Sequence, residues 1–191
     1  MSVAQVSALV AVAANVIARR AGVALVATLV ACSPALDWRE ATVDGPGLAA
    51  MFPCRPIAQS REVPLAGATV NMRLLACETD GRTFAIGVAD VQDPAAVAKA
   101  MTALRDASLD KLSGPPKAAS AAVAGWAVDG ATPQPTAGRW QVNTRRPDGG
   151  PLSLDTALLA RGTWVIQATV IGGKADPNAS APFFDGLRFV R

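Results

Sequence analysis

The chain has 191 residues, with 18 Lys and Arg against 15 Asp and Glu, which gives a formal net charge of +3. It contains no histidine and no tyrosine, so a His-based catalytic triad, a His metal site and the commonest general base are excluded. Aromatic residues make up 5% of the chain and do not alternate with basic residues, as a surface that stacks nucleic-acid bases would require. The composition therefore argues against nucleic-acid binding, and no residue pattern indicates a cofactor or a metal.

An apolar run near the start has the layout of a secretory signal. Arg19-Arg20 precede residues 21–31, which carry no charge and no proline, and Cys32 follows. A charged flank, a short apolar stretch and small residues at the cleavage point are typical of such a signal. The run is shorter than the about 20 apolar residues that cross a bilayer comfortably.

The tetrad Leu29-Val30-Ala31-Cys32 resembles the bacterial lipobox. The resemblance implies that diacylglycerol is attached to the Cys32 sulfur, that the chain is cleaved before Cys32, and that the new amino group is acylated, for example with palmitate. We therefore expect residues 1–31 to be a lipoprotein signal peptide and residues 32–37 to be a tether. Because 18 residues precede Arg19, more than a usual charged flank, we expect translation to begin near Val16 from a non-standard start codon.

The residue after the lipidated cysteine bears on location. In enteric bacteria an Asp there favours retention at the inner membrane, so Ser33 resembles the default, an outer-membrane lipoprotein facing the periplasm. The alternative is an uncleaved N-terminal anchor helix. It is disfavoured because Arg19 and Arg20 would each cost about 3 kcal/mol inside a bilayer. Without these two arginines the mature part, 32–191, has a net charge of only +1, which gives little attraction to nucleic acid.

Two of the three cysteines remain after lipidation of Cys32. Cys54 and Cys77 form an even pair, and a secreted protein lies in an oxidising compartment. We predict that they form a disulfide, which would close a loop of about 22 residues and contribute roughly 3 kcal/mol. The alternative is a pair of buried, reduced thiols.

The rest of the chain, 38–191, is predicted to form a single globular domain of strands and two helices. Asp80-Gly81 is a favoured two-residue hairpin turn, and its register pairs Cys77 with Phe84. In the strand at 139–145, alternation places Trp140 inward and Arg139 outward. In chain order the strands are predicted at 38–43, 48–52, 63–65, 69–78, 83–90, 121–128, 139–145, 152–160, 163–171 and 187–190.

Two helices are predicted from their start signals. Asp93-Pro94 is an N-cap followed by proline at the first helical position, and apolar residues recur at helical spacing to residue 112. Asp176-Pro177 is a second N-cap followed by proline and predicts a short helix that runs to about Asp185 and ends at Gly186. Since both faces of the hairpin are apolar, the sheet needs a cover on both sides. The predicted class is α+β, one antiparallel sheet flanked by one long and one short helix.

This order of elements resembles the PsbP-like fold of small secreted proteins and lipoproteins. Three features carry the resemblance: a strand that runs into proline at 48–53, a strand pair that leads to a long helix at 94–112, and an aromatic pair, Phe183-Phe184, before the terminal strand. The resemblance implies an α/β/α sandwich over most of 38–191. It implies no active site, because members of the family generally lack a shared one and a fold does not fix a function.

Several side chains are weaker candidates for a site. Asp155 and Asp185 are candidate acids, but no partner is evident, so a surface role is favoured. Gly172-Gly173-Lys174 lacks the upstream glycine and following hydroxyl of a phosphate loop. The four tryptophans are expected in the core. An anion- or lipid-headgroup-facing patch would use six arginines, although near-neutral charge favours an ordinary solvated face: Arg55, Arg61, Arg73, Arg139, Arg145 and Arg146.

The favoured function is a non-enzymatic binding or scaffolding domain of an envelope lipoprotein, held to membrane lipid through Cys32 and able to bind an envelope protein. The alternative is a periplasmic hydrolase or transferase that uses carboxylates and is anchored by an uncleaved N-terminal segment. An enzyme should have a deep pocket with converging carboxylates, whereas a binding module should have a groove or an apolar patch. A third hypothesis, a sensor domain on the membrane surface, predicts an exposed apolar patch near a sheet edge.

Overall fold

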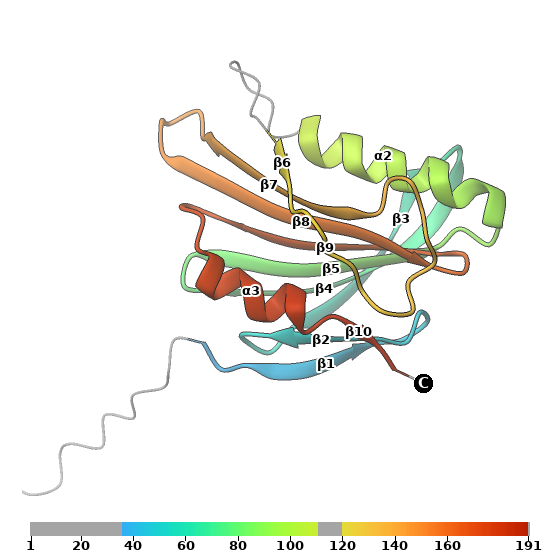
Figure 1. The fold of residues 1–191 in the computed structure, drawn as a ribbon, viewed down its shortest axis with the longest axis horizontal. Coiled ribbons are helices and arrows are strands. Elements are labelled where there is room, and N and C mark those ends of the chain that lie inside the picture. Colours follow the sequence, from blue (N-terminus) through green and yellow to red (C-terminus); the bar gives the residue numbers. More distant parts are fainter. Residues whose placement is uncertain (1–35, 111–119, 191) are drawn as a thin grey trace, which may run out of the picture. The chain divides into compact units, whose positions relative to one another are not determined.

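Two antiparallel sheets organise residues 36–110 and 120–190, which are the residues that the structure, a computed structural model, describes (Figure 1). The smaller sheet has the order β1-β2-β10: β1 (Arg39–Val43), β2 (Leu48–Phe52) and β10 (Arg188–Phe189). The larger sheet has the order β3-β4-β5-β9-β8-β7-β6: β3 (Ile57–Leu65), β4 (Ala68–Thr79), β5 (Arg82–Asp90), β6 (Ser120–Ala122), β7 (Gly138–Arg145), β8 (Pro151–Arg161) and β9 (Trp164–Gly172). The helical elements are the 3₁₀ turn η1 (Pro94–Ala96), α2 (Val97–Asp110) and α3 (Pro177–Asp185). The content is mixed, α with antiparallel β.

The hairpin predicted around Asp80-Gly81 joins β4 to β5 near the middle of the larger sheet. Asp80 and Gly81 have φ angles of 50° and 66°, the left-handed backbone that the favoured two-residue hairpin turn requires. The predicted register is confirmed, because Cys77 is paired with Phe84. The same register places Phe84 on one face of the sheet and Ala85 on the other.

The prediction of one sheet is wrong, because the chain changes sheets after β2. Pro53 and Pro56 cannot donate backbone hydrogen bonds, and the chain between them leaves the smaller sheet and enters the larger one as β3. The smaller sheet is then completed from the other end of the chain, where Arg188 of β10 pairs with Ala49 of β2. A pairing between such distant segments has no local sequence signal.

Two predicted strands differ in length from the observed ones. The edge strand predicted at 63–65 is the nine-residue β3, whose first six residues are exposed and so lack an apolar pattern. The strand predicted at 121–128 is only the short β6, since the chain turns at Gly125, which has a φ of 71°. Val128 nevertheless reaches the core, with 9% of its surface exposed.

Asp93 is an N-cap as predicted, but it caps the 3₁₀ turn η1, and the α-helix α2 begins three residues later than predicted, at Val97. The Asp93 carboxylate accepts a hydrogen bond from the Ala95 backbone N–H at 2.9 Å. The buried side of α2 carries Val97, Ala100 and Met101. These residues pack on one face of the larger sheet with residues of β3, β4, β5, β8 and β9: Leu65, Val70, Ala89, Leu158, Ala160 and Val165. The predicted end of this helix, at 112, lies outside the described residues.

The short helix α3 is also capped as predicted. The Asp176 carboxylate accepts from the backbone N–H groups of Asn178 and Ala179, and Gly186 ends the helix. A side chain at Gly186 would not fit, because its Cβ would lie 2.7 Å from Cγ of Met51 in β2. This close approach brings α3 against the smaller sheet.

Phe183 of α3 is the centre of the main core. It is fully buried, and its ring centroid lies 5.3 Å from that of Phe52 in β2 and 5.6 Å from that of Phe84 in β5. Both contacts are edge-to-face, an arrangement that stabilises aromatic pairs beyond their buried area. One side chain thus joins the smaller sheet, the larger sheet and α3.

Replacing Phe183 with alanine should destabilise the domain strongly. We expect Phe183→Ala to lower the free energy of unfolding by about 3–5 kcal/mol, because it leaves a cavity between two sheets. Urea unfolding followed by tryptophan fluorescence measures this change. Asn178→Ala, at an exposed position of the same helix, is the control and should change stability by less than about 0.5 kcal/mol. Equal stabilities of the two variants would contradict this role of Phe183.

Candidate functional site

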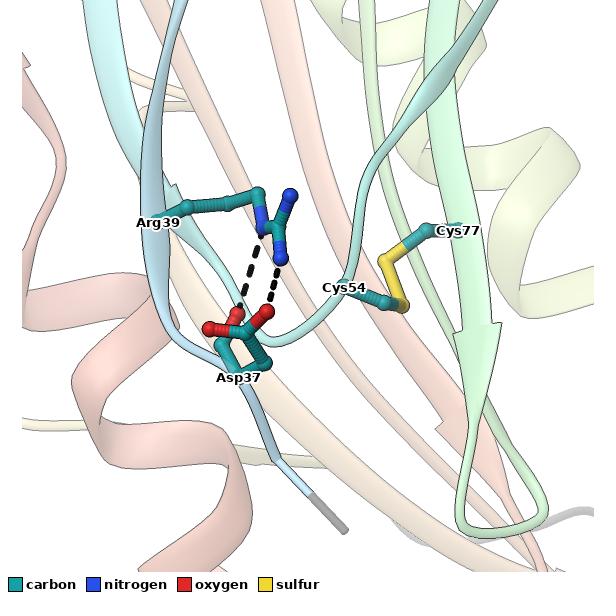
Figure 2. Close-up of a disulfide and its surroundings, with 4 residues drawn as sticks. All are labelled: Asp37, Arg39, Cys54 and Cys77. Carbon is teal, nitrogen blue, oxygen red and sulfur yellow. Dashed lines mark hydrogen bonds and ion pairs between the residues drawn. A yellow bond between two sulfur atoms is a disulfide. The ribbon is translucent and has the colours of Figure 1, made fainter. Parts of the chain in front are cut away.

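The two cysteines predicted to form a disulfide lie at bonding distance (Figure 2). Cys54 is in the segment that leads from β2 to β3, and Cys77 is on β4. Their sulfur atoms are 2.09 Å apart and their Cα atoms 5.9 Å apart, a usual separation for a disulfide. The bond links the place where the chain leaves the smaller sheet to a central hairpin of the larger one. Cys32 lies outside the described residues.

An ion pair lies beside this disulfide, where the chain enters β1. Figure 2 shows the Arg39 guanidinium turned back toward the Asp37 carboxylate, with which it forms the pair. The Asp37 backbone N–H donates to the Pro53 carbonyl at 2.9 Å. Both charged groups are exposed, so the ion pair contributes little to stability. The backbone hydrogen bond fixes where the folded chain begins.

A buried ion pair corrects two predictions. Arg139, predicted to point outward, is 7% exposed, and Asp155, predicted to be a surface carboxylate, is 6% exposed. Nε and Nη2 of Arg139 donate to the two carboxylate oxygens of Asp155 at 2.8 and 2.7 Å. The alternation of apolar and polar residues along β7 did not predict this burial, because both faces of the larger sheet are covered. The face that carries the polar residues is therefore partly buried as well.

Three further side chains complete this cluster. The Gln141 amide donates to Asp155 at 3.0 Å, and the hydroxyl of Ser180 on α3 donates to the same oxygen at 3.2 Å. The Arg139 guanidinium carbon lies 4.0 Å from the ring centroid of Phe184, within the range of a cation–π contact. Asp155 therefore accepts four hydrogen bonds, three at one carboxylate oxygen and one at the other.

The cavity next to Asp155 is small. Its volume is about 30 Å³, enough for a water molecule and too small for a substrate. Asp176 also lines it, but its carboxylate is bonded to Arg82 at 3.1 Å. Lys174, from the glycine pair that does not match a phosphate loop, lies on its rim. The second candidate acid, Asp185, is exposed at the end of α3.

A larger hollow lies at the opposite end of the strands. Its volume is about 290 Å³, and its lining includes Asn71, Arg73, Asp90 and Trp164. We call it the Trp164 hollow. The Trp164 ring packs so closely on Gly45 that a Cβ there would lie 2.4 Å from it. An aromatic ring beside charged and amide groups offers both stacking and hydrogen bonds to a ligand. No sequence motif indicated this site, because its residues come from three separate segments.

The six arginines do not form one patch. Arg139 is buried, Arg73 bonds Asp44 at 3.3 Å, and the Arg145 guanidinium donates to the Gly149 carbonyl at 3.0 Å. The others lie on different segments: Arg55, Arg61 and Arg146. The tryptophans pack at the edges of the two cores and are all half-buried.

Neither a metal site nor a membrane span was found in the described part of the chain. Among residues 36–110 and 120–190, no three Cys, Asp or Glu side chains cluster as metal ligands would. Within the same ranges no helix has the length and apolar character needed to cross a bilayer. Comparison with family models, curated proteins and solved structures finds no match.

Removing the buried carboxylate should be more harmful than removing the whole pair. We expect Asp155→Asn to cost about 3–5 kcal/mol of stability, because Arg139 keeps its charge without a counterion. The double variant Asp155→Leu with Arg139→Met should recover most of this loss, since no buried charge remains. Urea unfolding of the single and double variants tests this. A single variant as stable as the unmodified protein would show that the pair is not buried in solution.

The disulfide is tested by alkylation and mass measurement. In the native protein we expect a thiol reagent to modify neither Cys54 nor Cys77 until a reductant is added. The variant with Cys54→Ser and Cys77→Ser should lose roughly 3 kcal/mol of stability. Reductant should destabilise the unmodified protein and leave this variant unchanged. Two freely alkylated thiols in the native protein would contradict the bond.

Proposed function

We propose that this chain is a lipoprotein of the bacterial cell envelope, with a mature part that binds or scaffolds another envelope component and is not an enzyme. The observation that carries the proposal is the tetrad Leu29-Val30-Ala31-Cys32 behind Arg19-Arg20 and a short apolar run. The thiol of Cys32 is the group that can take up diacylglycerol. Membrane lipid is then the first partner of the protein, reached through acylated Cys32.

The cysteine geometry supports an extracytoplasmic location. Cys54 and Cys77 lie at disulfide distance, and stable disulfides are typical of oxidising compartments such as the periplasm. Of the three cysteines this leaves Cys32 for the lipid. Ser33 after it favours the outer membrane over the inner one.

The beginning of the folded unit is compatible with cleavage before Cys32. Asp37 makes the first backbone hydrogen bond described, to Pro53. Cleavage before Cys32 would therefore leave every described strand intact, and residues 32–37 would serve as a short tether.

The fold that we propose for the mature part is the PsbP-like α/β/α sandwich. Three facts support it: α2 packs on one face of the larger sheet, Phe183 of α3 packs on residues of the opposite face, and β2 runs directly into Pro53. The presence of a second, three-stranded sheet is an addition to that pattern. A fold of this type leaves the ligand open.

A binding role is supported over catalysis by the state of the carboxylates. Asp155 accepts four hydrogen bonds beside a cavity of about 30 Å³, whereas carboxylate catalysis needs converging acids in an accessible pocket. The Trp164 hollow, at about 290 Å³, has the size and lining of a small binding site. We therefore assign ligand or partner binding to that hollow.

The lipid anchor is tested by removing its attachment atom. Cys32→Ser should block lipidation and cleavage, so the domain should leave the outer-membrane fraction as released, uncleaved or mis-sorted protein. Fractionation of the host envelope, followed by intact mass measurement, checks both effects. Cys54→Ser with Cys77→Ser is the control, which should stay in the membrane fraction. Unchanged membrane association and mass of the Cys32→Ser protein would contradict lipidation.

A further inference from the structure

One end of the larger sheet collects the segments nearest to the tether. The register places Arg82 opposite Gly172, and Gly172 opposite Ser153. The β4–β5 turn, the end of β9 and the start of β8 therefore lie at the same end of the strands (Figure 1). The segment after β2 is held at the same end of the strands by the Cys54–Cys77 bond. We call this the anchor-side end; it consists of residues 53–57, 78–82, 146–150 and 173–176.

Chain length limits how far this end can lie from a lipid on Cys32. Four residues lie between Cys32 and Asp37, and the five residue steps from one to the other span at most about 17 Å when extended. The backbone N–H of Asp37 is bonded to the Pro53 carbonyl. The tether therefore reaches the fold at the anchor-side end, and a lipid surface around Cys32 stays within about two helix diameters of it. Tethering of this kind gives an effective concentration of about a millimolar, so weak contacts suffice.

An exposed apolar side chain lies at this end. Ile57 is 68% exposed, and within the described part of the chain it is the large hydrophobic side chain that remains exposed. It is the first residue of β3, an edge strand of the larger sheet, and it directly follows Pro56. Its backbone is held in the sheet by pairing with Ala76. The side chain is thus presented on a rigid strand.

Three cations without ion-pair partners lie along the same end of the sheet, Arg55 close to Ile57 in sequence and the other two beyond β9 and β7. Arg55, Arg146 and Lys174 are exposed, and the structure gives none of these three described side chains an ion pair. At the same end Asp80 and Asp176 share one cation, since both pair with Arg82. Glu78 and Asp148 remain without an ion pair there. The segments that define this end carry four cations and four carboxylates, so the end is neutral overall, and Arg55, Arg146 and Lys174 are its cations without an ion pair.

The opposite end of the sheet carries the cations Arg161 and Lys99 and several carboxylates. Asp90, Asp93 and Asp129 lie there, and none of these three described carboxylates has an ion pair with Lys or Arg. An anionic surface would meet fewer free carboxylates at the anchor-side end than at the opposite end.

We propose that the anchor-side end rests on the lipid leaflet that holds Cys32, with Ile57 inserted among the headgroups and with Arg55, Arg146 and Lys174 against anionic lipid phosphates. This inference rests on the proposed lipidation. Basic side chains near an anionic leaflet each add to the attraction, and their aliphatic parts can lie along the interface. The orientation leaves the Trp164 hollow pointing away from the membrane, where a partner can reach it.

The test uses the lipidated protein purified from its host and placed in vesicles of equal parts phosphatidylcholine and phosphatidylglycerol. An environment-sensitive fluorescent amino acid is incorporated at Ile57 in one protein and, as the control, at Ala95 in another, an exposed position at the opposite end. Nitroxide-labelled lipid is the quencher. We expect a blue shift and loss of emission at position 57 and neither change at position 95. Charge removal by Arg55→Gln, Arg146→Gln and Lys174→Gln should reduce the loss, whereas Arg61→Gln, Lys99→Gln and Arg105→Gln should not.

The outcomes separate the two proposals. Lipidated protein with equal, water-like emission at both positions would overturn the membrane contact and leave the lipoprotein assignment standing. A concentration-dependent blue shift at position 57 without vesicles would show that a second copy covers Ile57, which also overturns it. Protein without lipid on Cys32, and absent from the vesicles, would overturn both proposals.

Discussion

The fold depends on the edge-to-face contacts of Phe183 with Phe52 and Phe84, because these rings belong to different sheets. The smaller sheet has three short strands, and a sheet of that size needs packing against other elements to persist. Phe183 supplies that packing, and the Cys54–Cys77 bond constrains the same junction covalently. The two sheets therefore behave as one core, although the chain leaves one for the other at a pair of prolines.

The same helix determines the buried polar cluster. Ser180 and Phe184, on either side of Phe183, contact Asp155 and Arg139. Every buried polar side-chain atom in the described residues has a hydrogen-bond partner, which is the condition under which a buried ion pair is tolerated. The cluster is thus explained by its role in the structure, and the described features to which we assign a function are the anchor-side end and the Trp164 hollow.

Local signals in the sequence predicted local structure well. The Asp80-Gly81 turn, the Asp93 and Asp176 caps and the cysteine pair each depend on a few neighbouring residues or on compartment chemistry, and the structure has them as predicted. The second sheet and the burial of Arg139 were missed because they depend on distant segments: β10 closes the smaller sheet, and α3 covers the polar face of β7. The Trp164 hollow was missed for the same reason, since no stretch of sequence contains its lining.

The account of where this protein works depends on the state of the Cys32 sulfur. The most direct measurement is the intact mass and N-terminal peptide of the mature protein isolated from its host. The account predicts a chain that begins at Cys32 and carries both a thioether-linked diacylglycerol and an amide-linked acyl chain. A mature chain that begins at any other residue, or at Cys32 without lipid, would contradict it.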